Sequence, residues 1–174
     1  MLTFAVGAWL TPLRPAQTDA PVVEAHMVLA TDAVHPGSPA KAAVVVQIPS
    51  GYHINDHKPS LEYLIPTELR LEANKQVEVI KIDYPKGELV KLAFSDTALS
   101  VYQGKITVGA MLKVATATAP GSYTEKGKFA YQACNDHACF PPTSVPVTLS
   151  VRVVGRQVPV KQVNADVFLT SASK

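Results

Sequence analysis

A strict alternation of apolar and polar residues in two segments is the feature that most constrains the fold of this chain. In residues 145–153 valine or leucine occupies every odd-numbered position, and in residues 106–114 an apolar residue occupies every even-numbered one. Successive side chains of a β-strand point to opposite faces of the sheet, so a period of two is typical of a strand with one buried face. No segment keeps a 3.6-residue apolar period over three helical turns. The chain is therefore predicted to fold mainly from β-strands.

Weaker strand patterns occupy much of the remaining sequence, and turn-forming segments rich in proline, glycine and serine separate them. The predicted additional strands cover residues 22–30, 41–48, 51–55, 67–73, 76–83 and 123–133. Seven or more short strands at this spacing predict an all-β fold, an antiparallel β-sandwich of immunoglobulin-like architecture. The antibody subfamily is excluded, because the two cysteines lie close together and the single tryptophan, Trp9, is near the N-terminus.

Length and composition fit a single β-domain. The chain has 174 residues, 47% of them hydrophobic, and a formal net charge of +2. This apolar content excludes a mostly disordered chain, and the low charge argues against a nucleic-acid partner. No apolar run approaches the roughly 20 residues needed to cross a membrane, so we expect no membrane span in this chain. No motif calls for a cofactor.

The two ends of the chain differ from the region between them. Residues 1–20 begin with an apolar run of the length of a signal-peptide core, which we interpret as a weak or truncated export signal. A first strand or a disordered terminus is the alternative for this segment. Residues 21–155 form the predicted domain, and residues 156–174 lose the alternation and are predicted to be a tail or linker. Export would place the chain in an oxidising compartment, where disulfides persist.

The only two cysteines, Cys134 and Cys139, are separated by four residues. Asn135 and Asp136 between them favour a turn, so the cysteines can flank a hairpin loop and face each other on neighbouring strands. Cross-strand Cα separations of about 4.5–5.5 Å lie within the range of about 4.4–6.8 Å that a disulfide accepts. A disulfide between Cys134 and Cys139 is therefore geometrically plausible.

Three roles for this pair stay open on the residues alone. A structural disulfide closing so short a loop would contribute roughly 2 kcal/mol, which a chain with this much apolar content does not need. A redox pair would exchange through a mixed disulfide, and His137 inside the loop would favour a thiolate. A metal site for zinc or copper(I) would use soft ligands from His53, His57, Cys134, His137 and Cys139.

Two further classes of protein are weighed against the redox interpretation. A thioredoxin fold is excluded, because the cysteine spacing is not C-x-x-C and no βαβ pattern is present. A non-catalytic binding sandwich that uses its sheet edges for partners remains an alternative to both redox and metal chemistry.

Three segments resemble the N-terminal, periplasmic domain of the DsbD thiol:disulfide interchange protein family. The most specific is residues 131–142, with an aromatic residue, the two cysteines and paired prolines. Residues 51–55 are similar to a glycine-aromatic strand beside the family's active site. Residues 84–87, followed by Phe94 and Tyr102, are similar to the segment that leads to the family's cap loop. Together these segments span a little over half of the chain.

The resemblance implies an immunoglobulin-like sandwich that carries out extracytoplasmic thiol–disulfide exchange. Cys139 would form the mixed disulfide with a partner, and Cys134 would be the resolving thiol. Phe94 would cap the pair, and His53, Asn55 and His137 would tune it. The electron donor would be a thioredoxin-like or membrane thiol–disulfide protein, and oxidised periplasmic proteins would be the acceptors.

The chain also differs from the family pattern at defined positions. Family members have five residues between the cysteines, acidic residues just before the cap phenylalanine, and tyrosines facing the cysteines. This chain has four residues between its cysteines, Leu92 and Ala93 before the phenylalanine, and His53 and Asn55 in place of the tyrosines. Family members are usually fused to a membrane-embedded conduit and a thioredoxin-like domain. We therefore expect this chain to be a free-standing or an excised domain in the periplasm, either free or tethered through a partner.

Overall fold

The computed structural model describes residues 22–72 and 74–170. These residues form eleven strands and one short helix. In chain order they are β1 (Glu24–Leu29), β2 (Pro39–Gln47), β3 (His53–Asn55), β4 (Glu68–Leu71), β5 (Val77–Asp83), β6 (Glu88–Val90), β7 (Leu99–Tyr102), β8 (Lys105–Val114), β9 (Gly121–Tyr131), β10 (Ala133–Cys134), β11 (Thr143–Val153) and α1 (Ala165–Thr170).

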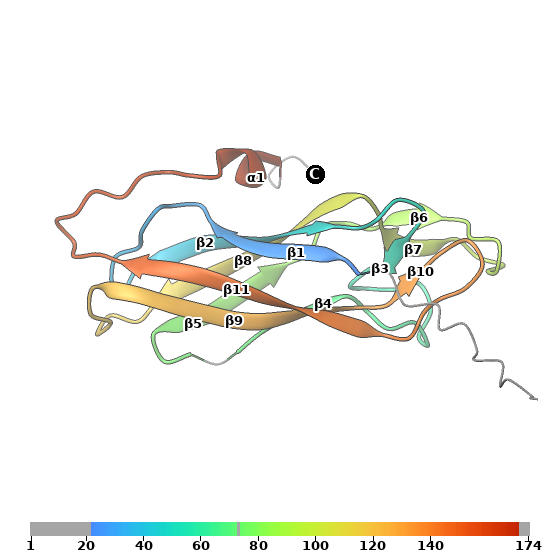
Figure 1. The fold of residues 1–174 in the computed structure, drawn as a ribbon, viewed down its shortest axis with the longest axis horizontal. Helices are drawn as coiled ribbons and strands as arrows, with labels where there is room; N and C mark the ends of the chain where they lie inside the picture. The colour runs from blue at the N-terminus through green and yellow to red at the C-terminus, as the bar shows by residue number, and fades with distance from the viewer. Residues whose placement is uncertain (1–21, 73, 171–174) are drawn as a thin grey trace, which may run out of the picture.

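Two antiparallel sheets form the body of the molecule. One has the strand order β1-β2-β8-β5 and the other β11-β9-β4. The alternating residues of β8 and β11 point into the space between them, where Val108, Leu112 and Val151 are fully buried. This arrangement, with the long axis of the molecule horizontal in Figure 1, confirms the predicted immunoglobulin-like sandwich.

A third sheet, with the order β10-β3-β7-β6, lies at one end of the sandwich (Figure 1). Its strands are two to four residues long, which is why the sequence pattern predicted only β3 among them. One face of this end sheet packs on the main core through Ile54, Tyr102 and Ala133. Since side chains alternate between faces, their neighbours Val101 and Cys134 point to the opposite face, into a second and smaller apolar cluster.

The segment after β11 returns along the sandwich. The backbone N–H of Asp32 donates to the carbonyl of Lys161, and the N–H of Val163 donates to the carbonyl of Ala30. Asn164 adds a side-chain hydrogen bond to the carbonyl of Leu29, and α1 follows at once. The sequence predicted residues 156–174 as a tail or linker. The part of this segment that precedes α1 is held against the domain by these hydrogen bonds.

The predicted export signal, residues 1–20, and the last residues, 171–174, lie outside the described part of the chain. Within residues 22–72 and 74–170, no helix is long and apolar enough to span a lipid bilayer.

Candidate thiol–disulfide site

Cys134 and Cys139 form a disulfide at the end sheet, as the spacing allowed. The N–H of Asn135 donates to the carbonyl of Ala138, and the N–H of Phe140 donates to the carbonyl of Ala133. These two bonds flank the cysteines and make them a non-hydrogen-bonded antiparallel pair, in which facing side chains come closest. The Cα atoms are 3.9 Å apart, nearer than the 4.5 Å expected for such a pair.

Asn135 shapes the loop between the two cysteines. Its Oδ1 accepts hydrogen bonds from the backbone N–H groups of His137 and Ala138, each 2.9 Å long. This Asx turn lets four residues close the hairpin, and it confirms that Asn135 is the turn former of the loop.

The two cysteines differ in their exposure. Cys134 is fully buried, whereas Cys139 is only partly buried. The cluster around Cys134 is apolar, and its buried members are Leu64, Leu92, Leu99 and Val101, with Leu61, Val90 and Cys139 at its edge. A reagent arriving from solvent therefore meets Cys139 before Cys134.

Two loops supply the apolar cover of the disulfide. The first covering loop, residues 56–67 between β3 and β4, contributes Leu61 and Leu64. The second covering loop, residues 91–98 between β6 and β7, contributes Leu92. Leu92 was noted in the sequence only as a difference from the family pattern, yet its side chain is 1% exposed and packs in the cluster that holds Cys134.

His53 is the cross-strand neighbour of Cys134. The register pairs Cys134 with His53 on one side and with Cys139 on the other, and directly opposite residues project to the same face of a sheet. His53, Cys134 and Cys139 therefore form a row on one face. The His53 side chain is 9% exposed, and its Nδ1 atom is buried without a hydrogen-bond partner.

Asn55 and Gln132 form a polar network beside this row. Asn55 Nδ2 donates to the carbonyl of Ile65 (2.9 Å) and to Gln132 Oε1 (3.0 Å). Gln132 Oε1 also accepts from the N–H of Ile65, and its Nε2 donates to the carbonyl of Phe140. Gln132 thus ties the first covering loop to the residue that follows Cys139. Sequence reasoning gave it no role, although its position two residues before Cys134 places both on one face.

Two other predicted site residues are exposed. Phe94, on the second covering loop, is 41% exposed and is not among the residues that pack in the cluster around Cys134. His137 is exposed in the loop between the cysteines.

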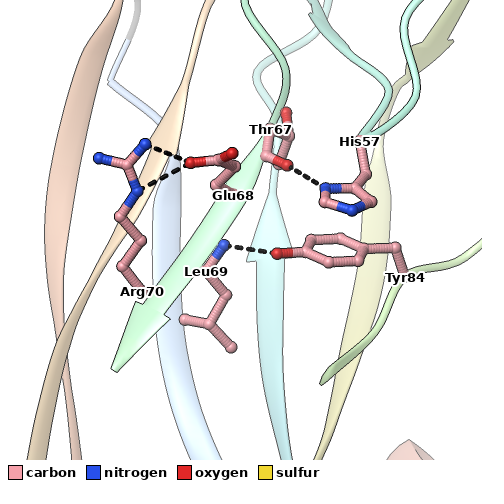
Figure 2. Close-up of polar contacts among 6 residues, drawn as sticks. All are labelled: His57, Thr67, Glu68, Leu69, Arg70 and Tyr84. Atoms are coloured by element: carbon pink, nitrogen blue, oxygen red, sulfur yellow. Dashed lines mark hydrogen bonds and ion pairs between the residues drawn. The ribbon is translucent and has the colours of Figure 1, made fainter. Parts of the chain in front are cut away.

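His57 lies apart from the other residues predicted as metal ligands. Figure 2 shows its ring stacked on Tyr84, with ring centroids 3.7 Å apart, and its Nδ1 donating to the carbonyl of Thr67 at 3.0 Å. The Tyr84 hydroxyl in turn accepts from the N–H of Leu69. Within residues 22–72 and 74–170, no three His, Cys, Asp or Glu side chains gather to hold a metal ion. The structure therefore does not assemble the five-residue metal set.

Asp56 fixes the start of the first covering loop. Its carboxylate accepts hydrogen bonds from the Ser100 and Tyr102 hydroxyls of β7, each 2.6 Å long. Burial alone would raise the pKa of Asp56, but these hydrogen bonds outweigh it and hold the pKa below its usual value of 3.8. Gly87 borders this cluster, where a Cβ atom would collide with Asp56 and Ser100.

Comparison with known proteins identifies the family. The family model of the N-terminal part of the thiol:disulfide interchange protein DsbD matches residues 20–150. The chain belongs to this family. The resemblance seen in the sequence is therefore confirmed, and the family links this domain and its cysteine pair to thiol–disulfide interchange. No curated protein sequence matches the chain.

Several solved structures are similar to this chain at low sequence identity. The N-terminal periplasmic domain of ScsB from Proteus mirabilis is 16% identical, with a TM-score of 0.49, over 79% of this chain and 49% of that one. The DsbD N-terminal domain from Neisseria meningitidis, in a complex with the PilB N-terminal domain, is 17% identical, with a TM-score of 0.40, over 78% of this chain and 86% of that one. A cohesin from Pseudobacteroides cellulosolvens is 13% identical, with a TM-score of 0.43, over 78% of this chain and 94% of that one. This chain thus spans about half of the ScsB structure.

Proposed function

We propose that this chain is an extracytoplasmic thiol–disulfide exchange domain. It relays electrons from a thioredoxin-like or membrane thiol–disulfide protein to oxidised periplasmic proteins through the Cys134–Cys139 pair. The observation that carries this proposal is the unequal exposure of the two cysteines beneath two covering loops. A purely structural disulfide needs no such cover. It would also add little, because closing so short a loop contributes roughly 2 kcal/mol to the stability of a domain that already has a large core.

In this proposal each cysteine has one role. A thiolate of the reducing partner attacks the more accessible Cys139 sulfur, the Cys134–Cys139 bond breaks, and Cys134 takes the electron pair. A second thiolate of the partner then attacks the partner's sulfur in the mixed disulfide and releases Cys139. The chain leaves as a dithiol and the partner as a disulfide. Reduction of an oxidised acceptor runs through the same steps in reverse.

The covering loops limit which thiols reach the pair. Leu92 anchors the second covering loop in the apolar cluster, and Phe94 stands on its exposed side, where an arriving partner meets it. Tyr63 and Ile65 of the first covering loop are also exposed, at 76% and 43%. A thioredoxin-like partner would bind these apolar side chains while it displaces the covering loops. Asn55 would tune the pair through its buried position on the same face, and His137 through its place in the cysteine loop.

Single-cysteine variants test the assignment of roles. Cys134→Ser leaves the accessible thiol and Cys139→Ser leaves the buried one. We expect the variant that keeps Cys139 to form a mixed disulfide with an activated thioredoxin-like protein at least about tenfold faster, because exposure limits thiol–disulfide exchange. Equal rates, or a faster reaction of the variant that keeps Cys134, would contradict the assignment. Alkylation in 6 M urea controls for intrinsic reactivity, since both thiols are then exposed.

A further inference from the structure

We propose that His53 is the acid–base group of the resolving cysteine. Its imidazole gives a proton to the Cys134 sulfur when the Cys134–Cys139 bond breaks and takes that proton back when the bond forms. This inference rests on the proposed exchange function, and it assigns one step of that function to one atom, Nδ1 of His53.

The first argument is the environment of Cys134. When the disulfide is cleaved by attack on Cys139, the bonding electron pair stays on the Cys134 sulfur. That sulfur is fully buried among Leu64, Leu92 and Val101, so solvent does not reach it while the covering loops are in place. A low-dielectric environment disfavours a buried thiolate, and the step needs a proton source inside the protein.

The second argument is which polar groups share that face of the end sheet. Asn55 and Gln132 lie beside the cysteines, and their amides bond to each other and to the backbone of the first covering loop. The Oδ1 atom of Asn55 is buried without a partner, but an amide oxygen cannot exchange a proton at ordinary pH. His53 is paired directly with Cys134 across β3 and β10, and its Nδ1 is also buried and unpartnered. Imidazole is the group on this face that can give and take a proton.

Other titratable side chains on the elements around this face have exposed positions or partners of their own. Asp56 and His57 on the first covering loop are bonded to β7 and to Thr67. The exposed groups are Lys58, Glu62 and Tyr63 on the first covering loop, Glu88 on β6, Lys91 and Asp96 on the second covering loop, and Asp136 and His137 between the cysteines.

The step balances in atoms and electrons. In the forward direction a partner thiolate forms a bond to the Cys139 sulfur, the Cys134–Cys139 bond breaks, and the imidazolium of His53 gives its proton to the departing Cys134 sulfur. The products are a mixed disulfide, a neutral Cys134 thiol and a neutral imidazole. In reverse, Nδ1 takes the Cys134 proton as that sulfur attacks the mixed disulfide and the partner leaves as a thiolate.

The test compares His53→Gln with the matched control His26→Gln, which removes an exposed histidine of β1, outside the end sheet. Both variants and the parent chain are reduced with dithiothreitol at several pH values, and reduction is followed by alkylation and mass shift. We expect His53→Gln to slow reduction by about 100-fold near neutral pH, the lower end of the range for general acid–base catalysis, and to lose one inflection of the pH profile. His26→Gln should keep the rate within about twofold and the shape of the profile.

A folded His53→Gln variant with the parent's rate and pH profile would overturn the inference and leave the exchange function standing. Failure of dithiothreitol to reduce the parent chain would overturn the exchange function itself. Nitrogen-15 spectra of the histidine side chains in the parent chain provide a second measurement that needs no variant. We expect the Nδ1 resonance of His53 to shift on reduction of the disulfide while that of His26 on β1 stays, and an unchanged His53 resonance would contradict the proposal.

Discussion

Replacing Leu92 with alanine should unmask the disulfide. The Leu92 side chain is 1% exposed, and it is the buried residue by which the second covering loop joins the cluster around Cys134. A buried leucine-to-alanine change costs 2–5 kcal/mol, and a loop position that can partly collapse belongs at the lower end, about 2 kcal/mol. If this energy is lost from the closed state of the loop alone, the population of the open state rises about 30-fold, since 1.4 kcal/mol is a factor of ten.

The assay is the second-order rate of disulfide reduction by dithiothreitol, measured below the unfolding transition. Leu92→Ala should reduce about 30-fold faster than the parent chain. Phe94→Ala is the matched control on the same loop, and because that side chain is already 41% exposed we expect an increase below about fivefold. A Leu92→Ala rate within twofold of the parent, or a larger effect from Phe94→Ala, would refute the reasoning that Leu92 holds the cover closed.

Three further changes test other parts of the structure. Glu125 of β9 is fully buried, and this burial raises its pKa above 4.5. Its charged form therefore destabilises the fold at pH values above the folded-state pKa, so Glu125→Gln should stabilise the domain in urea unfolding at pH 8 and not at pH 4. A gain in stability that does not depend on pH would contradict this. Asp56→Asn should lower the free energy of unfolding by about 1–2 kcal/mol at pH 7, because it weakens the hydrogen bonds to Ser100 and Tyr102. Since the folded-state pKa of Asp56 is lowered, this loss of stability should vanish as the pH falls well below 3.8. A loss of stability that persists in acid would exclude the carboxylate as its cause. Gln132→Ala should free the first covering loop from the residue after Cys139. We expect faster amide hydrogen exchange at Ile65 and a several-fold faster reduction of the disulfide. Unchanged hydrogen exchange at Ile65 would show that Gln132 does not hold this loop.

The long strands could be predicted from the sequence because their burial is one-sided. β8 and β11 are 10 and 11 residues long and have one face in the main core, so period two is visible in them. β6, β7 and β10 are two to four residues long, too short to show a period. The end sheet that carries the disulfide was therefore visible only through β3 and the cysteines.

The features of the site that depend on residue type could be predicted from the sequence. The features that depend on tertiary packing could not. The cysteines and the turn former Asn135 could be found from their spacing. The burial of Leu92, rather than Phe94, in the cluster around Cys134 depends on how the second covering loop folds over the end sheet. The bonds of Gln132 join segments 67 residues apart in the chain, and no local pattern records such a contact. His57 was grouped with the metal ligands by type, but its ring packs on Tyr84.

The midpoint reduction potential of the Cys134–Cys139 couple tests the central claim most directly. The protein would be equilibrated across a series of reduced and oxidised glutathione, or dithiothreitol at the low end, and the thiol fraction read by alkylation and mass shift. An exchange domain should titrate above about −300 mV, within the span of about −120 to −270 mV known for thiol–disulfide exchange proteins. A potential well below about −300 mV would mark a structural disulfide and contradict the account.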